Sequence, residues 1–432
     1  MNSKLGYPQK MKNTRHSKLK LTLVGACLGA LIAGTPTARA QEAAPPTAKK
    51  LKQLENENED LRKRLDALEG ILQKEGLAPS CDKGDSGSPA VKALSDITLS
   101  GFVTASYFYD GSSPKDGSPN AYLWNRSHDS FTLNKFKLVL ASPPAAKSGD
   151  TFSAGYRASL IFGEDSPIVD TGLGVPGFGN IREAYVDLNV PIGTGLNIKA
   201  GQLISLLNYE SGDGGSANAN FSQGNQWFFT GNGPGAGVQA SYDLTDKMTA
   251  TFRVQNGLYA GAKDNNGYKT FLGSLAFKPT PDIWFNLIGF GGRGDVVPGE
   301  WLKGGSVIGG VKVAKVTLGT ELDYFSTDLA GGGDSAAYSA GLWVSTDLTD
   351  KVGVALRGDY ITDKDGFFTA GLLGLPVGGG TDLASITLTL NWKPVPNVKV
   401  QPEIRYDHAS RAGDFDGHEN RFIFGAGISY LF

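Results

Sequence analysis

Apolar and polar side chains alternate with a period of two from about residue 96 to the end of the chain. The final segment shows this pattern most clearly. Its apolar positions are Phe422, Phe424, Ala426, Ile428, Tyr430 and Phe432. The positions between them include Arg421, Gly425, Gly427 and Ser429. Because successive side chains of a β-strand point to opposite faces, the pattern predicts a strand with one apolar face.

The segments between the alternating stretches are of two kinds. Short turn motifs recur, since Asp243–Lys247 (DLTDK) is repeated at 347–351 and Lys278–Asp282 (KPTPD) returns as KPVPN at 393–397. Further short turns are predicted at 143–150, at 191–195 and near 314–315. Eight longer polar or glycine-rich segments separate them, at 110–129, 164–179, 208–233, 258–267, 292–303, 327–335, 364–380 and 410–418.

Seven short turns and eight long loops make fifteen connections, which predicts about sixteen strands with both ends on the short-turn side. Short turns at one end and long loops at the other are typical of bacterial outer-membrane barrels. A soluble β-sandwich is the alternative, but its outward face should be polar, whereas one face here is apolar with aromatic residues near the strand ends. The predicted fold class is an all-β transmembrane antiparallel barrel over 96–432, preceded by a short α-helical coiled coil.

The first 95 residues predict four segments. Residues 1–40 have a basic start, an apolar run of 14 residues and a small-x-small site, as in a secretory signal peptide. A lipoprotein signal cut before Cys27 is the alternative, but the apolar run continues past that cysteine. Residues 41–50 form an N-terminal tail, and 51–75 carry leucines at heptad spacing, which predicts a coiled coil. Residues 76–95 contain glycine and proline and predict a flexible linker.

Composition agrees with an exported barrel. The mean hydropathy of -0.19 suits strands in which apolar and polar residues alternate, and it argues against a helical membrane bundle. Removing the seven positive charges of residues 1–40 from a chain of net charge -2 leaves -9, so no nucleic-acid partner is expected. Export would leave Cys81 as a single thiol, either bridged to another molecule or free.

Charged residues fall on the face opposite the apolar one, where they would line the interior of a barrel. The predicted pore-lining residues are Lys135, Lys137, Arg157, Glu183, Asp187, Lys199, Arg253, Glu321, Asp323, Arg357, Asp359, Glu403, Arg405 and Asp407. Basic residues prevail early in the chain and acidic ones late. These groups could set a field across the pore, or they could pair along the wall and select nothing.

Three short motifs resemble the OmpL-like β-barrel porin family over about residues 96–432. They are Leu99–Val103 (LSGFV), Ile181–Leu188 (IREAYVDL) and Ala200–Gln202 (AGQ). The resemblance implies passive transport across the outer membrane and supplies no substrate. A coiled coil ahead of the barrel is similar to that of trimeric dicarboxylate-type porins, so a homo-oligomer is expected, with a trimer favoured.

The longest loop, 208–233, is the third external one. General porins of sixteen strands fold this loop into the barrel as a constriction, and by resemblance Glu210, Asp213 and Trp227 are the candidates here. The end of the chain resembles the signal by which barrels reach the outer-membrane insertion machinery. The residues carrying that resemblance are Phe424, Ile428, Tyr430 and Phe432.

The sequence therefore predicts a porin for small hydrophilic solutes or ions, in contact with outer-membrane lipid and lipopolysaccharide, with its coiled coil in the periplasm. A structural or adhesive barrel anchored by the coiled coil is the alternative. A hydrolase is disfavoured, because adjacent residues such as His128, Asp129 and Ser130 cannot form a catalytic triad on one strand. No catalytic residue, metal site or cofactor is expected.

Overall fold

The computed structural model describes residues 97–432, apart from 116, 123, 145–150, 170–178, 231–234, 265, 294–299, 330–331 and 374–378. Four predicted segments lie outside the described residues. They are the signal peptide (1–40), the tail (41–50), the coiled coil (51–75) and the linker (76–95). Within the described part, no helix is both long and apolar enough to span a membrane.

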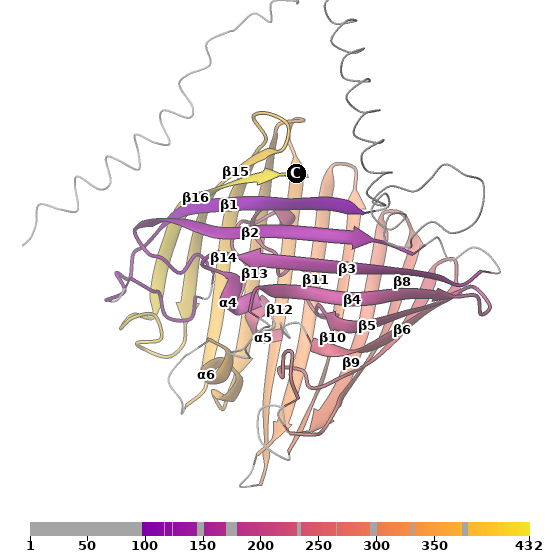
Figure 1. The fold of residues 1–432 in the computed structure, drawn as a ribbon. Helices are drawn as coiled ribbons and strands as arrows, with labels where there is room; N and C mark the ends of the chain where they lie inside the picture. Colours follow the sequence, from indigo (N-terminus) through magenta and orange to yellow (C-terminus); the bar gives the residue numbers. More distant parts are fainter. Residues whose placement is uncertain are drawn as a thin grey trace, which may run out of the picture. The chain divides into compact units, whose positions relative to one another are not determined.

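Sixteen antiparallel strands form one closed barrel, in which each strand pairs with its neighbours in sequence (Figure 1). The strands are β1 (Thr98–Asp110), β2 (Ser130–Ser142), β3 (Ser153–Phe162), β4 (Ile181–Val190), β5 (Leu196–Leu203), β6 (Gly235–Thr245), β7 (Met248–Gln255), β8 (Thr270–Thr280), β9 (Ile283–Arg293), β10 (Trp301–Val313), β11 (Val316–Asp328), β12 (Asp334–Asp347), β13 (Val352–Asp363), β14 (Thr381–Trp392), β15 (Val398–Ala409) and β16 (Asn420–Leu431). The predicted number of strands and the alternation of short and long connections are both confirmed.

The barrel closes where β16 pairs with β1, in a register that joins Val103 to Tyr430 and Thr104 to Ser429. The last residue, Phe432, extends this pairing, because its N–H donates to the carbonyl of Gly101 at 3.0 Å and its own carbonyl accepts from the Gly101 N–H at 2.9 Å. Both backbone groups at the C-terminus are therefore used in closing the ring, which leaves no open sheet edge there.

Two of the short turns contain a residue other than glycine with a left-handed backbone. Asn397, in the turn between β14 and β15, has a φ of 67°, and Ala314, in the two-residue turn between β10 and β11, has a φ of 54°. Asparagine adopts this conformation at low cost, whereas alanine does so rarely. The long connections instead carry four short helices, α4 (Ser166–Val169), η1 (Gly215–Ala217), α5 (Asn225–Thr230) and α6 (Phe367–Leu373).

The outward face of the strands is apolar, as the alternation predicts. On β16, Phe422 is 55% exposed and Ile428 and Tyr430 are each 50% exposed, whereas the intervening Arg421 and Ser429 are buried inside the ring. An apolar belt on the outside and polar groups inside are what a barrel in lipid requires.

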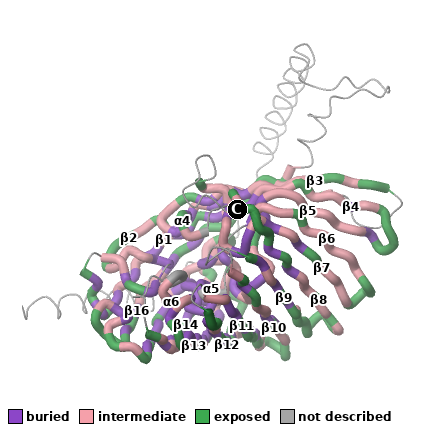
Figure 2. Tube along the Cα trace, turned by 90° about the horizontal axis from the view of Figure 1, so that it is seen from below, coloured by how far each residue is buried: buried purple, intermediate pink, exposed green. Residues whose placement is uncertain are grey.

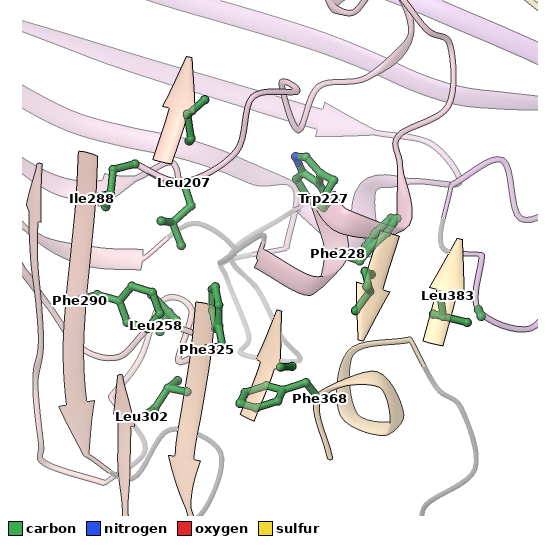
Figure 3. Close-up of a cluster of buried hydrophobic side chains, with 14 of the residues drawn as sticks. Leu207, Trp227, Phe228, Leu258, Ile288, Phe290, Leu302, Phe325, Phe368 and Leu383 are labelled. Carbon is green, nitrogen blue, oxygen red and sulfur yellow. The ribbon is translucent and has the colours of Figure 1, made fainter. Parts of the chain in front are cut away.

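The interior departs from the simple expectation of a polar, water-filled lumen. Inward-facing apolar residues of β8 to β14 meet the long loops in one buried cluster towards the long-loop end (Figure 3). Its members include Leu207, Trp227, Phe228, Leu258, Ile288, Phe290, Leu302, Phe325, Phe368 and Leu383. Part of the lumen is thus a hydrophobic core that holds the inserted loops in place.

Candidate channel constriction

The connection between β5 and β6, residues 204–234 and here named L3, enters the barrel. It carries η1 and α5, and α5 packs against the inner faces of β12, β13 and β14 while η1 packs against β16 (Figure 1). The described residues of L3 are 204–230, with the side chains described up to residue 228. The two helices of L3 therefore lie against one side of the lumen, and named hydrogen bonds hold them there.

Glu403, on the inner face of β15, holds the middle of L3. Its carboxylate accepts a hydrogen bond from the backbone N–H of Phe221 at 2.7 Å and another from the N–H of Ser222 at 3.2 Å. The hydroxyl of Thr389 on β14 donates to the same carboxylate at 2.7 Å. Hydrogen bonds to a charged acceptor are worth more than neutral ones, so Glu403 is a strong anchor for the loop.

Arg357 on β13 is a second anchor, and its side chain is fully buried. Its Nη1 donates to Oε1 of Glu210 at 2.9 Å and also to the carbonyl of Ser222. Its Nη2 donates to the hydroxyl of Thr387 at 2.8 Å, and Asp359 lies 3.5 Å from its Nε. The predicted constriction residue Glu210 is thus brought to the wall, where it neutralises an arginine.

Arg405 on β15 binds the start of α5. Its Nη1 donates to the carbonyl of Gln223 at 2.8 Å, and its Nη2 donates to Oδ1 of Asn225 at 2.6 Å. Asp407 accepts from the Nε of Arg405 at 2.6 Å and from the Nε of Arg421 at 2.7 Å. The guanidinium therefore orients the helix while the carboxylate between the two arginines balances their charge.

The acidic residues of β11 complete this attachment. Glu321 accepts from the backbone N–H of Tyr209 at 2.7 Å. Asp323 accepts from the amide of Gln226 and from the hydroxyls of Ser306 and Ser339. Burial, reinforced by the carboxylate of Glu210, raises the pKa of Tyr209, so its phenol stays neutral.

The opposite side of L3 is tied to β2 and β4 through Asp213. The carboxylate of Asp213 pairs with Nζ of Lys137, and it lies 3.5 Å from Nε of Arg182. Burial alone would raise the pKa of Asp213, but the two cations lower it below its usual value. Asp213 is consequently ionised over the whole neutral range, and L3 is held to the wall at two separated points.

Trp227 packs against the first long loop and exposes little of its surface. Its indole N–H donates to the carbonyl of Glu210 at 3.1 Å, and its ring lies 5.2 Å from that of Trp124 with an interplanar angle of 65°. Lys135, below them, pairs with Asp165 at 2.6 Å and lies 4.2 Å from the Trp124 ring centroid. Trp227 thus contributes to the packing of the loops on each other.

The predicted interior residues divide into two groups. Those with buried side chains are Lys135, Lys137, Glu183, Arg253, Glu321, Asp323, Arg357, Asp359, Glu403, Arg405 and Asp407. Arg157, Lys199 and Asp187 keep exposed fractions of 35%, 29% and 15%. They belong to β3, β4 and β5, where Figure 2 shows mostly intermediate and exposed residues. Water therefore reaches the inner wall on the side that L3 does not cover.

The charges of this uncovered wall also form pairs. Arg157 donates to Glu183 at 2.6 Å, and Lys199 lies 3.9 Å from Asp187. The ion pairs around L3 and the two pairs here agree better with pairing along the wall than with a row of free charges. Arg253 binds uncharged groups instead. Its guanidinium donates to the side-chain oxygen of Gln239 and to the carbonyl of Ile204, the latter at 2.8 Å.

One interior residue departs from the period of two, and two others are apolar where polar residues are expected. Arg182 is buried beside its neighbour Glu183 because a register shift between Ser159 and Leu160 places both on the inner side. Trp284 and Trp343 also lie on the inner face, where they contact Tyr209 of L3. The residues around the bulge give no sign of it in the sequence. The two tryptophans, however, are apolar residues at positions predicted to face a polar lumen, and this could have been noticed.

A family model and several solved structures match the barrel. Residues 96–432 match the family described as "Putative beta-barrel porin-2, OmpL-like". An anion-selective porin from Comamonas acidovorans is 14% identical, with a TM-score of 0.53 over 78% of this chain and 99% of that one. The trimer form of OmpT from Vibrio cholerae is 11% identical, with a TM-score of 0.54 over 78% and 99%.

OprB from Pseudomonas putida is 12% identical, with a TM-score of 0.51 over 81% of this chain and 97% of that one. Identities this low show a shared fold alone. A comparison with curated protein sequences gives no match. Because the family match spans the whole barrel, the chain belongs to the OmpL-like β-barrel porin family, and it is an outer-membrane channel and not an enzyme.

Proposed function

We propose that this porin allows passive diffusion of small hydrophilic solutes and ions along a path between L3 and the inner faces of β3 to β9. The observation that carries the proposal is the difference in exposure between the wall of β12 to β15, against which α5 of L3 lies, and the wall of β3 to β5, which L3 touches through Asp213. The side chains of Arg357, Asp359 and Arg405 beneath the loop are at most 1% exposed, whereas Arg157 and Lys199 on the far wall are about one-third exposed. A solute would pass where water already reaches the wall.

In this proposal the predicted interior residues have different tasks. Arg357, Glu403 and Arg405 hold L3, together with Glu321 and Asp323, while Arg157 and Lys199 with their partners Glu183 and Asp187 line the path. Glu210 and Asp213 fix the loop that narrows the lumen, and Trp227 packs it. On the side that water reaches, the cations are more exposed than the anions with which they pair. A weak preference for anions follows.

The same proposal includes assembly and surroundings. Phe424, Ile428, Tyr430 and Phe432 lie on the outer face of β16 and its extension, with exposed fractions of 50% at Ile428 and Tyr430, in a position accessible to an insertion machinery. A signal peptide over 1–40, a periplasmic coiled coil over 51–75 and a trimer remain part of the proposal, as do contacts with lipid and lipopolysaccharide. The trimer form of OmpT supplies the precedent for three copies of such a barrel.

The test is the single-channel conductance of the purified protein in a planar bilayer, with the reversal potential measured in a salt gradient. Ohmic steps of constant size with a reversal potential on the anion side are expected, and closure in threes would support the trimer. A folded barrel that conducts no current would contradict the proposal. Since loops fill much of the long-loop end, that result would favour a structural or adhesive barrel anchored by its coiled coil.

A further inference from the structure

Three aromatic rings form a panel on the inner wall, made of Tyr209 from L3, Trp284 from β9 and Trp343 from β12. The ring centroids of Tyr209 and Trp284 are 6.0 Å apart, with planes inclined by 7°. Those of Tyr209 and Trp343 are 4.6 Å apart, with planes inclined by 28°. Near-parallel rings from three separate chain segments present a continuous apolar surface within a lumen that is otherwise lined by polar groups at this level.

Two glycines make the wall behind this panel flat. Trp284, Gly310, Gly319 and Trp343 are successive partners across β9, β10, β11 and β12, so they form one row around the barrel. A Cβ atom at Gly319 would lie 2.1 Å from Cζ of Tyr209, and one at Gly310 would lie 2.7 Å from Nε1 of Trp284. Any larger residue would push the rings off the wall, so these positions require glycine.

The panel is accessible from the lumen. Trp284 is 38% exposed although it faces inward, with Phe285 and Leu287 taking the outward positions on either side of the strand. Trp343, the other tryptophan of the panel, is buried against Tyr209 of L3. A large aromatic ring that water reaches inside a channel offers a stacking surface to a solute with a flat apolar face.

A cavity of about 520 Å³ begins one inward row beyond the panel, towards the short turns. Its walls include Lys312 and Thr317, which pair with each other two residues after Gly310 and two before Gly319. Lys315, Lys393 and Lys399 also line it, with Asp347 and Asp350 as its acidic residues. Successive inward side chains on a strand are roughly 7 Å apart. One small molecule could therefore contact both the rings and Lys312.

The lysines of this cavity outnumber its carboxylates, and they are only partly neutralised. Lys393 lies 3.8 Å from Asp347, whereas Lys399 donates to the backbone carbonyl of Asn218 in L3 at 2.7 Å. Among the described residues, no ion pair involves Lys312, Lys315 or Lys399. The cavity therefore offers cationic groups to an incoming anion at the point where the aromatic panel ends.

From this arrangement we propose that the panel and the cavity form a subsite for solutes that combine a flat ring with a carboxylate. The ring would stack on Trp284 while the carboxylate faces Lys312, and the solute would then move on to the periplasmic side. The inference rests on the proposed diffusion path, because Trp284 on β9 borders that path and the cavity lies beside it, between L3 and β10 to β15. It adds a solute class to the proposed function. Stacking is a weak interaction, so the subsite would concentrate such solutes without trapping them.

The test uses the full-length mature porin in planar bilayers, with benzoate, acetate and benzamide as probes of current block. Acetate matches the charge of benzoate without its ring, and benzamide matches the ring without the charge. Benzoate should half-block the current at a concentration about tenfold below that of either control. Trp284→Ala should raise the half-blocking concentration of benzoate about fivefold and leave that of acetate unchanged.

Matched variants keep the test decisive. Trp284→Phe retains a ring and should stay within about twofold of the parent, and Trp301→Ala, on the exposed outer face, should change nothing. Lys312→Gln should weaken block by benzoate but not by benzamide. Equal block by benzoate and benzamide, or by benzoate and acetate, would overturn the inference while the channel still conducts. An electrically silent barrel would instead mean that the proposed diffusion path itself is wrong.

Discussion

The inner walls of β11 to β16 and of β3 to β7 carry similar residue types but use them differently. On the first, Arg357, Arg405 and Glu403 are buried and each binds L3. On the second, Arg157 and Lys199 pair with neighbouring carboxylates and remain about one-third exposed. Charged side chains of the same types therefore hold the loop in place where it covers them, and they line a water-accessible surface where it does not.

The difference follows from electrostatics in two environments. Under L3 the groups have lost water, so an unpaired charge would cost several kcal/mol and each is matched by partners. On the exposed wall water screens each pair, and such pairs contribute about 0–1 kcal/mol. The first wall should therefore determine stability and aperture, whereas the second should determine ion preference.

The largest effect is expected for Arg357→Ala. The substitution leaves Glu210 and Asp359 buried without their cation, which should lower the free energy of unfolding by about 3–5 kcal/mol. L3 should loosen, so the single-channel conductance should rise or fluctuate. Lys199→Ala on the exposed wall is the matched control and should cost less than about 1 kcal/mol, because its partner Asp187 is 3.9 Å away and also partly exposed. Equal stability of the two variants would refute the proposed division of the walls.

A smaller effect is expected for Glu403→Gln. The isosteric amide keeps the side chain in place but weakens acceptance from Phe221 and Ser222, at a cost of about 1.5–3 kcal/mol. Denaturant unfolding in detergent measures this cost, and current noise reports the loosened loop. Asp187→Asn supplies the control on the exposed wall. A quiet, unchanged current would mean that Glu403 is not an anchor of the aperture.

Charge reversal on the exposed wall should alter selectivity without altering stability. The substitution Lys199→Glu should lower the anion-to-cation permeability ratio about twofold, because a carboxylate then replaces an ammonium group that faces the path. The reversal potential in a salt gradient gives this ratio directly. Lys303→Glu, on the outer face beside Asp328, is the control. A ratio that moves equally in both variants would argue against a path along β3 to β5.

The smallest effect is expected outside both walls, at Asp264 in the loop between β7 and β8. Its hydrogen bond from Lys269 lowers its pKa to about 2. A carboxyl with a depressed pKa stabilises the fold above its usual value of about 4 and loses that contribution as pH falls through about 2. Because the pair is exposed, Asp264→Asn should change stability by less than about 0.5 kcal/mol at pH 7 and leave conductance unchanged.

The strands could be predicted because each carries its own evidence. Alternation and repeated turns such as DLTDK and KPTPD indicate the strands locally, and the strands found number sixteen as expected. The inward position of Glu403, Arg405 and Asp407 follows from the same period of two, because alternate side chains of a strand lie on the same face. Entry of L3 into the barrel was expected from resemblance, and Glu210 and Asp213 do lie within the inserted loop.

Only the tertiary structure decided which charged side chains form ion pairs with one another and which remain exposed to water. Arg357 and Glu210 are 147 residues apart in sequence, and nothing local to either one selects the other. The aromatic panel similarly needs Tyr209, Trp284 and Trp343 from three segments, with Gly310 and Gly319 supplying the flat wall. A strand pattern specifies the face on which a side chain lies, but its neighbours across a lumen depend on ring closure and on the path of an inserted loop.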